Sequence, residues 1–278
     1  MRKQQTILLL AALAVLMLLF FFGKTVNPNK PSVQSSAPAA GESLNFDDIL
    51  NRSKQNLSLE QKEVLSGLEK SLVEAGGANK IKAFKALSSF WKETARVYEP
   101  YLFYLSEEAK LENSEKSLTF AAQQFTISLL DVSEPSIQNW LAKNGKVLFE
   151  KALAINPNND SSKIGLGACY ILGNISDNPM IGILPVREIA TKNPDNIFAQ
   201  MVLGLGGKKS GQFDKAIERF LIINNKQPEN LVVLLHLAEC YEMKGDKSSA
   251  KEWYLKSVGL VKNAEVRKEI EKRINELK

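Results

Sequence analysis

Apolar and small residues recur in the second half of the chain at a fixed spacing of 34 residues. The landmarks of the two clearest units are Leu203-Gly204, Gly211, Ala216 and Phe220, then Leu237-Ala238, Gly245, Ala250 and Tyr254. Within each unit, apolar residues lie three or four apart, which indicates amphipathic helices. A repeat of this length predicts a pair of helices that buries its apolar face only against neighbouring pairs.

The first half of the chain also shows a helical pattern, without a regular period. Ser58-Leu59-Glu60-Gln61 has the form of a capping box, which predicts a helix over Leu59–Ala75 that ends at Gly76-Gly77. Apolar spacing predicts further helices over Ile81–Tyr98, Ser114–Asp131 and Pro135–Ile155. No segment shows the alternation typical of a β-strand. The fold class expected for the soluble part is therefore all-α.

The units can be placed by carrying the register of the clear repeats along the chain. The unit before them holds about three extra residues, which we assign to Asn174–Asn178. A last helix, with Val266, Ile270 and Ile274 on one stripe, is expected to cap the stack. The expected helical segments are 44–113 (a degenerate hairpin), 114–159 (an irregular unit), 160–196, 197–230, 231–264 and 265–278 (the cap).

An uncharged apolar run at the N-terminus predicts a membrane anchor. Ile7–Gly23 has 17 residues, near the lower limit for a spanning helix. The cleaved signal peptide and the buried helix remain alternatives, so cleavage is left open. The slight positive charge of residues 1–6 favours a cytoplasmic N-terminus. Residues 24–43, rich in Pro, Ser, Ala and Asn, predict a tether. The protein would then be single-pass, with its bulk outside the cytoplasm, in the periplasm of a cell with two membranes.

Charge and polar motifs argue against catalysis and nucleic-acid binding. The formal net charge is +5, and without Arg2 and Lys3 the excess of basic over acidic residues is only three. That bias is too small and too dispersed for nucleic-acid recognition. The glycine-rich stretch Gly204–Gly211 lacks the lysine-hydroxyl ending of a phosphate loop and follows no strand. His236 is the only histidine, so neither a catalytic triad nor a metal cluster is expected. We therefore predict no enzyme activity, no cofactor, no metal and no small-molecule substrate.

Both cysteines are expected to be buried, unpaired thiols. Cys169 and Cys240 occupy the same position of units two repeats apart. Helices pack about 8–10 Å apart, and a disulfide needs Cα atoms within about 7 Å. The spacing therefore excludes a bridge between them.

These landmarks resemble the tetratricopeptide-repeat family, across roughly residues 80–278 and most strongly over Asp160–Asn263. The resemblance implies a right-handed α-solenoid that binds proteins. The anchor, the tether and segments such as Phe90-Trp91-Lys92 and Asn178-Pro179-Met180 are similar to a membrane-anchored group of Bacteroidetes-type bacteria. That group implies a scaffold at the bacterial inner membrane with no settled activity. Ile164, Ala168 and Val202 replace the Lys and Asn of carboxylate-clamp repeats, so the chain is not similar to that chaperone-binding subgroup.

The resemblance also implies which residues face the groove of such a solenoid. The inward positions are Ile164, Ala168, Ile171, Phe198, Met201, Leu205, Lys208, Val232, Leu235, Glu239 and Glu242. They are largely apolar with charges at one end, which suits a protein or peptide segment of unknown identity. One alternative is an apocytochrome-binding chaperone in cytochrome c maturation. Another is a structural solenoid whose groove is filled by Leu59–Ala75 or by the C-terminal helix.

Overall fold

The computed structural model describes residues 44–277, which form thirteen α-helices and one π-helical segment, with no strand in that range. The helices are α2 (Phe46–Gln55), α3 (Leu59–Glu74), α4 (Ala78–Ser89), η1 (Phe90–Ala95), α5 (Tyr98–Glu112), α6 (Glu115–Asp131), α7 (Pro135–Ile155), α8 (Asp160–Leu172), α9 (Met180–Lys192), α10 (Ile197–Lys209), α11 (Phe213–Lys226), α12 (Leu231–Lys244), α13 (Lys247–Val258) and α14 (Ala264–Glu276). The expected anchor (7–23) and tether (24–43) lie outside the described residues. None of the described helices is long and apolar enough to cross a bilayer.

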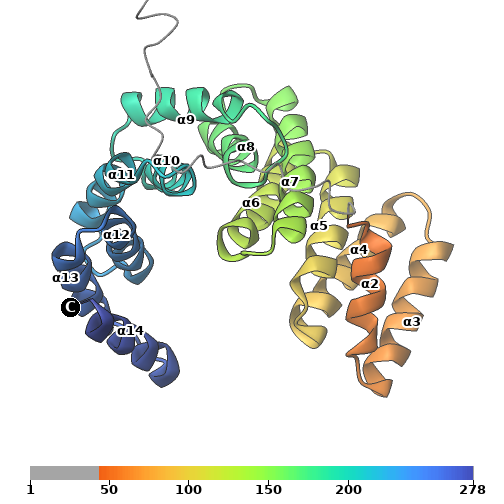
Figure 1. Ribbon diagram of the computed structural model, residues 1–278. Helices are drawn as coiled ribbons and strands as arrows, with labels where there is room; N and C mark the ends of the chain where they lie inside the picture. The colour runs from red at the N-terminus through yellow and green to blue at the C-terminus, as the bar shows by residue number, and fades with distance from the viewer. Residues whose placement is uncertain (1–43, 278) are drawn as a thin grey trace, which may run out of the picture. The chain divides into compact units, whose positions relative to one another are not determined.

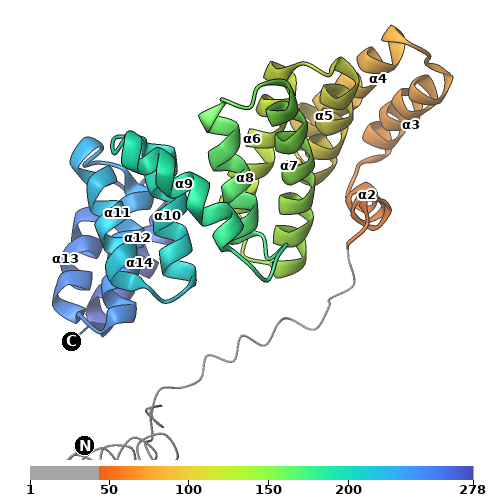
Figure 2. The same ribbon diagram turned by 90° about the horizontal axis from the view of Figure 1, so that it is seen from above.

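From α4 to α13 the helices pack as consecutive hairpins, each with a first and a second helix. The first helices are α4, α6, α8, α10 and α12, and each packs against the second helix that follows it. In Figure 1, α8, α10 and α12 lie on one side of the stack, and α9, α11 and α13 lie on the other. Each second helix also packs against the next first helix, so that α6, α7 and α8 lie side by side (Figure 2).

Asparagine caps set the beginning of the repeated first helices. The side chains of Asn159, Asn196 and Asn230 each accept a hydrogen bond from the backbone N–H three residues later, at 2.9, 3.0 and 3.2 Å. Such a cap satisfies one of the free N–H groups of the first turn. The step from Asn196 to Asn230 is the 34-residue period, and the preceding step is longer. The added length falls in the connection between Leu172 and Met180, the site predicted from the register.

Small residues allow the two helices of a hairpin to approach closely. Gly204 lies against the ring of Phe220, where an added Cβ would be 2.6 Å from Cε1. The next hairpin has Ala238 at the equivalent position, and both Ala238 and its partner ring Tyr254 are buried. Apolar side chains of successive hairpins form three clusters, over α2–α10, α10–α12 and α12–α14. The core is thus continuous between neighbours, as a repeat protein requires.

The helix predicted over Ile81–Tyr98 is interrupted, which corrects that expectation. The α-helix ends at Ser89, and Phe90–Ala95 form a π-helical turn. The wider turn allows adjacent Phe90 and Trp91 to be buried together, with 4% and 0% of their surface exposed. Arg96 then adopts a left-handed conformation (φ 56°), which ends the segment. Tyr98 belongs to α5 rather than to the preceding helix.

Candidate protein-binding surface on α10 and α12

The eleven residues expected in the groove do not share one environment. Ile164, Ala168 and Ile171 of α8 are buried and belong to the large core cluster. Ile171 also lies close to Gly206 of α10, where an added Cβ would be 2.6 Å from its Cγ2 atom. These three side chains therefore contribute to the core between α8 and its neighbours, and they offer almost no surface to a partner.

The equivalent positions of α10 and α12 reach the surface. Phe198, Met201, Leu205 and Lys208 of α10 are partly exposed, as are Leu235 and Glu239 of α12. Val232 is 54% exposed. We call these seven residues, with His236, the α10–α12 surface. It combines apolar side chains with one group of charged residues, a composition that suits a protein partner.

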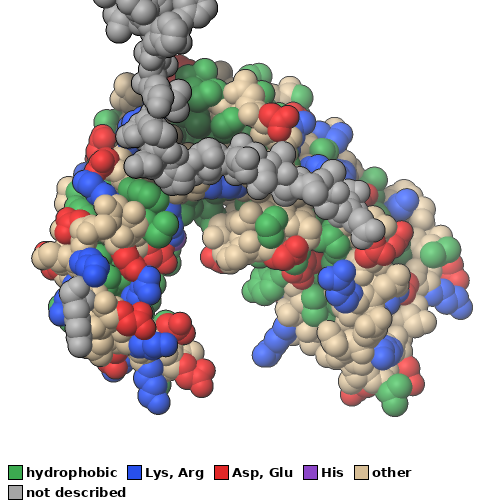
Figure 3. Space-filling model, viewed as in Figure 1, with side chains coloured by type: hydrophobic (Ala, Val, Ile, Leu, Met, Phe, Trp, Pro, Cys, Tyr) green, Lys and Arg blue, Asp and Glu red, His purple; other side chains and the backbone are tan. Residues whose placement is uncertain are grey.

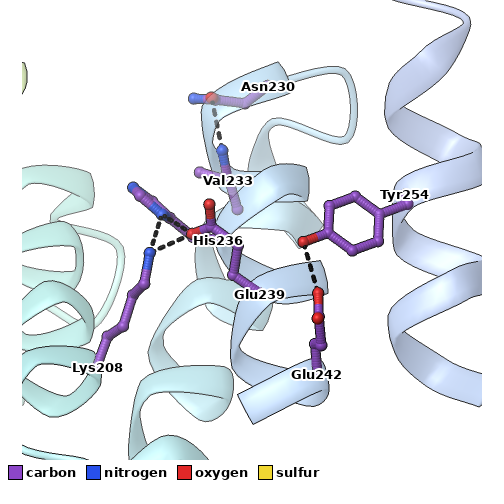
Figure 4. A network of polar contacts seen from close by, with 7 residues as sticks. All are labelled: Lys208, Asn230, Val233, His236, Glu239, Glu242 and Tyr254. Atoms are coloured by element: carbon purple, nitrogen blue, oxygen red, sulfur yellow. Dashed lines mark hydrogen bonds and ion pairs between the residues drawn. The ribbon is translucent and has the colours of Figure 1, made fainter. Parts of the chain in front are cut away.

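A polar network connects the two helices across this surface (Figure 4). The Lys208 ammonium on α10 forms an ion pair with Glu239 on α12. Its Nζ atom is also 3.2 Å from Nδ1 of His236, and that Nδ1 is 3.3 Å from Oε2 of Glu239. Lys208 thus contacts two residues of the next hairpin. It connects α10 and α12, whose backbones otherwise lie close together at few positions.

The neighbours of Glu239 keep its carboxyl group ionised. Nδ1 of His236 lies within hydrogen-bond distance of a donor, the Lys208 ammonium, and of an acceptor, the Glu239 carboxylate, and its role depends on the tautomer. Burial of Glu239 raises the pKa of its carboxyl. The hydrogen bonds and positive charge of His236 and Lys208 outweigh that effect and lower this pKa to about 2. The carboxylate is therefore ionised at neutral pH.

The participation of His236 was not foreseen from the sequence. Its ring stacks on Phe220 of α11, with centroids 5.2 Å apart and planes inclined by 25°. This stacking holds the imidazole beside Lys208. His236 and Glu239 are three residues apart on one helix, a spacing that places side chains on the same face. That spacing was the available signal, but it does not reveal the lysine contributed by another hairpin.

Glu242, the last of the expected groove residues, is engaged within the chain. Its carboxylate forms an ion pair with Arg273 of α14, whose Nε lies 3.1 Å from Oε2. It also accepts a hydrogen bond of 3.0 Å from the Tyr254 hydroxyl of α13. Glu242 raises the pKa values of both partners, and burial is the larger cause for Tyr254. The C-terminal helix thus covers this end of α12, whereas α3 packs on α4 and η1.

An exposed apolar stripe on α6 was not predicted from the sequence. Phe120 and Ile127 lie seven residues apart and are 49% and 54% exposed. Phe120 lines a cleft of about 300 Å³ between α4 and α6, whose floor includes Tyr101 and Glu108 of α5. The irregular period of this region prevented the register from being carried this far.

The described residues contain no cluster of His, Cys, Asp and Glu that would hold a metal ion. Cys169 and Cys240 are free and buried, as predicted. Burial raises the pKa of their thiols to about 12 and about 11, so neither is a thiolate nucleophile at neutral pH. On the face shown in Figure 3, acidic and basic side chains are interspersed over α12 and α14. That face has no extended patch of one charge.

Comparisons with known proteins found similarity over part of the chain. No family model matches the chain. Over 129 residues, which are 44% of this chain and 26% of the relative, it is 31% identical to human interferon-induced protein with tetratricopeptide repeats 2. The chain thus spans about a quarter of that relative's length.

Two solved structures match the chain over 67% and 74% of its length. One is MamA from residue 41 to its end, from Desulfovibrio magneticus RS-1, with 22% identity, coverage of 67% of this chain and 97% of that chain, and a TM-score of 0.44. The other is YrrB, described as a TPR protein with an unusual peptide-binding site, with 17% identity, coverage of 74% and 97%, and a TM-score of 0.44.

The recurring hairpins and the sequence similarity agree on the kind of repeat. The chain is similar to a tetratricopeptide-repeat protein over 129 residues, and its described helices form hairpins that repeat in the same way.

Proposed function

We propose that this protein is an envelope scaffold that binds a segment of another protein on the α10–α12 surface. The observation that carries the proposal is the contrast in exposure at equivalent repeat positions. Inward residues are buried on α8, whereas Phe198, Met201 and Val232 reach the surface without a covering helix among the described residues. An apolar surface of this kind, beside a charged network, suits a partner segment with an apolar side.

The second part of the proposal concerns location. The apolar run 7–23 anchors the chain in the bacterial inner membrane, and residues 24–43 tether the repeats in the periplasm. Its support is the composition of these segments and the lysine and arginine residues before the run. Membership of the Bacteroidetes-type anchored group belongs to this part of the proposal.

Photo-crosslinking in the native cell tests the binding surface directly. A photoreactive residue replaces Met201, and a matched control places it at Leu255, an exposed apolar position on α13. We expect a defined second protein to be captured from position 201 and not from position 255. Equal capture from both positions, or a crosslink from position 201 only to the same chain, would contradict the proposed surface.

Cell fractionation and a topology reporter test the location. We expect the full chain in the inner-membrane fraction, and a chain that begins at residue 44 in a soluble fraction. A C-terminal alkaline phosphatase fusion, active only outside the cytoplasm, should be active on the full chain. An inactive fusion on a stable, membrane-bound chain would overturn the periplasmic location.

A further inference from the structure

A small, buried residue marks the same position in each second helix from α7 to α13. In α9 this residue is Gly182, where an added Cβ would be 2.6 Å from the Gly167 carbonyl oxygen of α8. The equivalent residues in the repeat register are Gly145 of α7, Ala216 of α11 and Ala250 of α13, and all of them are buried. These residues allow the exposed positions of the four helices to be compared one by one.

Two residues after this position, the second helices differ in character. α11 has Glu218 there and α13 has Glu252, and both are exposed. α7 and α9 instead have Val147 and Leu184, which are 42% and 55% exposed. α9, α11 and α13 lie on the same side of the stack (Figure 1). At this position the outer surface is therefore apolar on α7 and α9 and charged on α11 and α13.

Further aliphatic side chains extend the apolar surface on both helices. Met180 and Ile181 of α9 are 40% and 50% exposed, and each lies one turn before Leu184. Ile155 of α7 is 48% exposed and follows Val147 by about two turns. The first half of α9 has no charged residue, and α7 and α9 both pack on α8.

Basic side chains without an acidic partner lie on the same two helices. Lys143 and Lys151 are each four residues from Val147, so the three side chains form one stripe along α7. Neither these lysines nor the exposed Arg187 of α9 forms an ion pair with a described residue. The acidic residue of each helix is already paired with a lysine of its own helix. We call the exposed aliphatic residues of α7 and α9, together with the three unpaired cations, the α7–α9 face.

An anionic lipid surface fits this combination of side chains. Aliphatic residues of an interfacial face enter the boundary between headgroups and acyl chains, and neighbouring Lys and Arg attract anionic headgroups. A second copy of the same face fits less well, because it would bring unpaired positive charges together. Under the proposed anchoring, residues 24–43 reach at most roughly 70 Å, which keeps the helices near a bilayer.

We propose that the α7–α9 face lies on an anionic lipid surface. The proposal rests on the membrane location proposed above. It assigns the outer side of α7 and α9 to lipid, whereas the α10–α12 surface consists of residues from two first helices.

Fluorescence quenching by lipids tests this contact on the full chain. Leu184→Cys, and the control Glu218→Cys at the equivalent position of α11, each carry a nitrobenzoxadiazole label, and the native cysteines are buried. The protein is reconstituted in vesicles of phosphatidylcholine and phosphatidylglycerol with nitroxide quenchers on the acyl chains. We expect the emission from position 184 to fall about twofold, since an interfacial apolar face enters the bilayer by about 5–10 Å. Emission from position 218 should change little.

The contact should also require anionic lipid. In vesicles of phosphatidylcholine alone, quenching at position 184 should be much weaker, because the cations of the face have no anionic headgroups to bind. Equal quenching at positions 184 and 218 would overturn the proposal, as would quenching at position 184 that does not depend on phosphatidylglycerol.

A charge placed within the apolar surface provides a second test. Leu184→Glu gives α9 the residue type that α11 has at Glu218, and the free energy of unfolding should change little because position 184 is exposed. With the label at Ile181→Cys, the Leu184→Glu variant should lose the quenching. Unchanged quenching would contradict the lipid contact. Protection of this label from aqueous iodide in detergent, increasing with protein concentration, would assign the face to a second copy and overturn the proposal.

These results can be separated from the tests of location. Quenching at position 184 together with an inactive phosphatase fusion rejects only the periplasmic location. A membrane-bound full chain without quenching at position 184 rejects only the lipid contact.

Discussion

Equivalent positions of successive repeats differ sharply between α8 and the two first helices that follow. The fifth residue of the unit is Ile164 in α8, Met201 in α10 and Leu235 in α12. Ile164 is 1% exposed, whereas Met201 and Leu235 are both partly exposed. The repeat pattern therefore predicts which side of a helix a residue occupies, but it does not predict whether that side is covered.

The difference follows from the neighbours of each first helix. α8 packs against α6 on one flank and α10 on the other, in addition to α7 and α9. Between α10 and α12 the approach is looser, and long side chains such as Lys208 and Glu239 connect them. Gly206 of α10, where an added Cβ would be 2.6 Å from Cγ2 of Ile171, permits the tighter packing of α10 on α8. An open surface thus arises where consecutive first helices separate.

Truncation at the fifth position should show the contrast most strongly. Ile164→Ala removes a fully buried side chain and should lower the free energy of unfolding by about 2–5 kcal/mol. Leu235→Ala, at the equivalent and partly exposed position, should cost about 1–2 kcal/mol. Urea denaturation followed by circular dichroism measures both. Equal losses would mean that α12 is covered as fully as α8, and the case for an open surface would fail.

Enlarging Gly204 at its close contact with Phe220 should give the next largest loss of stability. Gly204→Ala places a methyl group 2.6 Å from the Phe220 ring, which must move from its buried site. We expect a loss of about 1–3 kcal/mol through overpacking. The same measurement on Ala238→Gly, the equivalent position of the next hairpin, should give a loss of about 1 kcal/mol from helix propensity. A neutral Gly204→Ala would show that the α10–α11 contact has spare room.

Much of this organisation follows from the sequence, for identifiable reasons. Landmarks such as Gly204 and Phe220 predict which residues are in contact within one hairpin, because that contact is local and repeats every 34 residues. The capping box at Ser58 and Gln61 is present, with both of its hydrogen bonds. Such features depend on residues close in the chain.

Features that depend on packing between hairpins were less accessible. The π-helical turn at Phe90–Ala95 results from burying two adjacent aromatic residues, which helical spacing alone does not predict. Arg273 reaches Glu242 from the C-terminal helix α14, 31 residues away. His236 contacts Lys208, which belongs to the preceding hairpin. The repeat register does not predict how closely the first helices of two hairpins approach. These contacts decide which groove positions remain available.

The ion pair between α14 and α12 allows a local test of what holds the C-terminal helix on the end of α12. Arg273→Met removes the ion pair that holds α14 against Glu242 of α12. Amide hydrogen exchange should become faster in α14 and remain unchanged in α8. Lys272→Met is the matched control, because Lys272 is exposed and lies 4.0 Å from Glu276 within the same helix. If α14 exchanges equally in both variants, apolar contacts such as those of Ile270 hold it without the ion pair.

The smallest expected effect is a pH dependence of the free energy of unfolding, caused by Glu239 on the α10–α12 surface. The pKa of Glu239 is about 2 in the folded protein, below the roughly 4.3 of an unfolded glutamate. Its ionised form therefore stabilises the fold above about pH 4.3, and this contribution is lost as the pH falls towards 2. Because the side chain is 42% exposed, solvent screening limits the contribution to about 1 kcal/mol.

Glu239→Gln should therefore lower the free energy of unfolding by about 1 kcal/mol at pH 7 and by almost nothing near pH 2. Glu218→Gln is the control, since Glu218 is exposed on α11 and forms no ion pair with the described residues. A loss of several kcal/mol at pH 7 would indicate a pair buried like the α8 core. In that case α10 and α12 would be closed together in solution, and the difference from α8 would disappear.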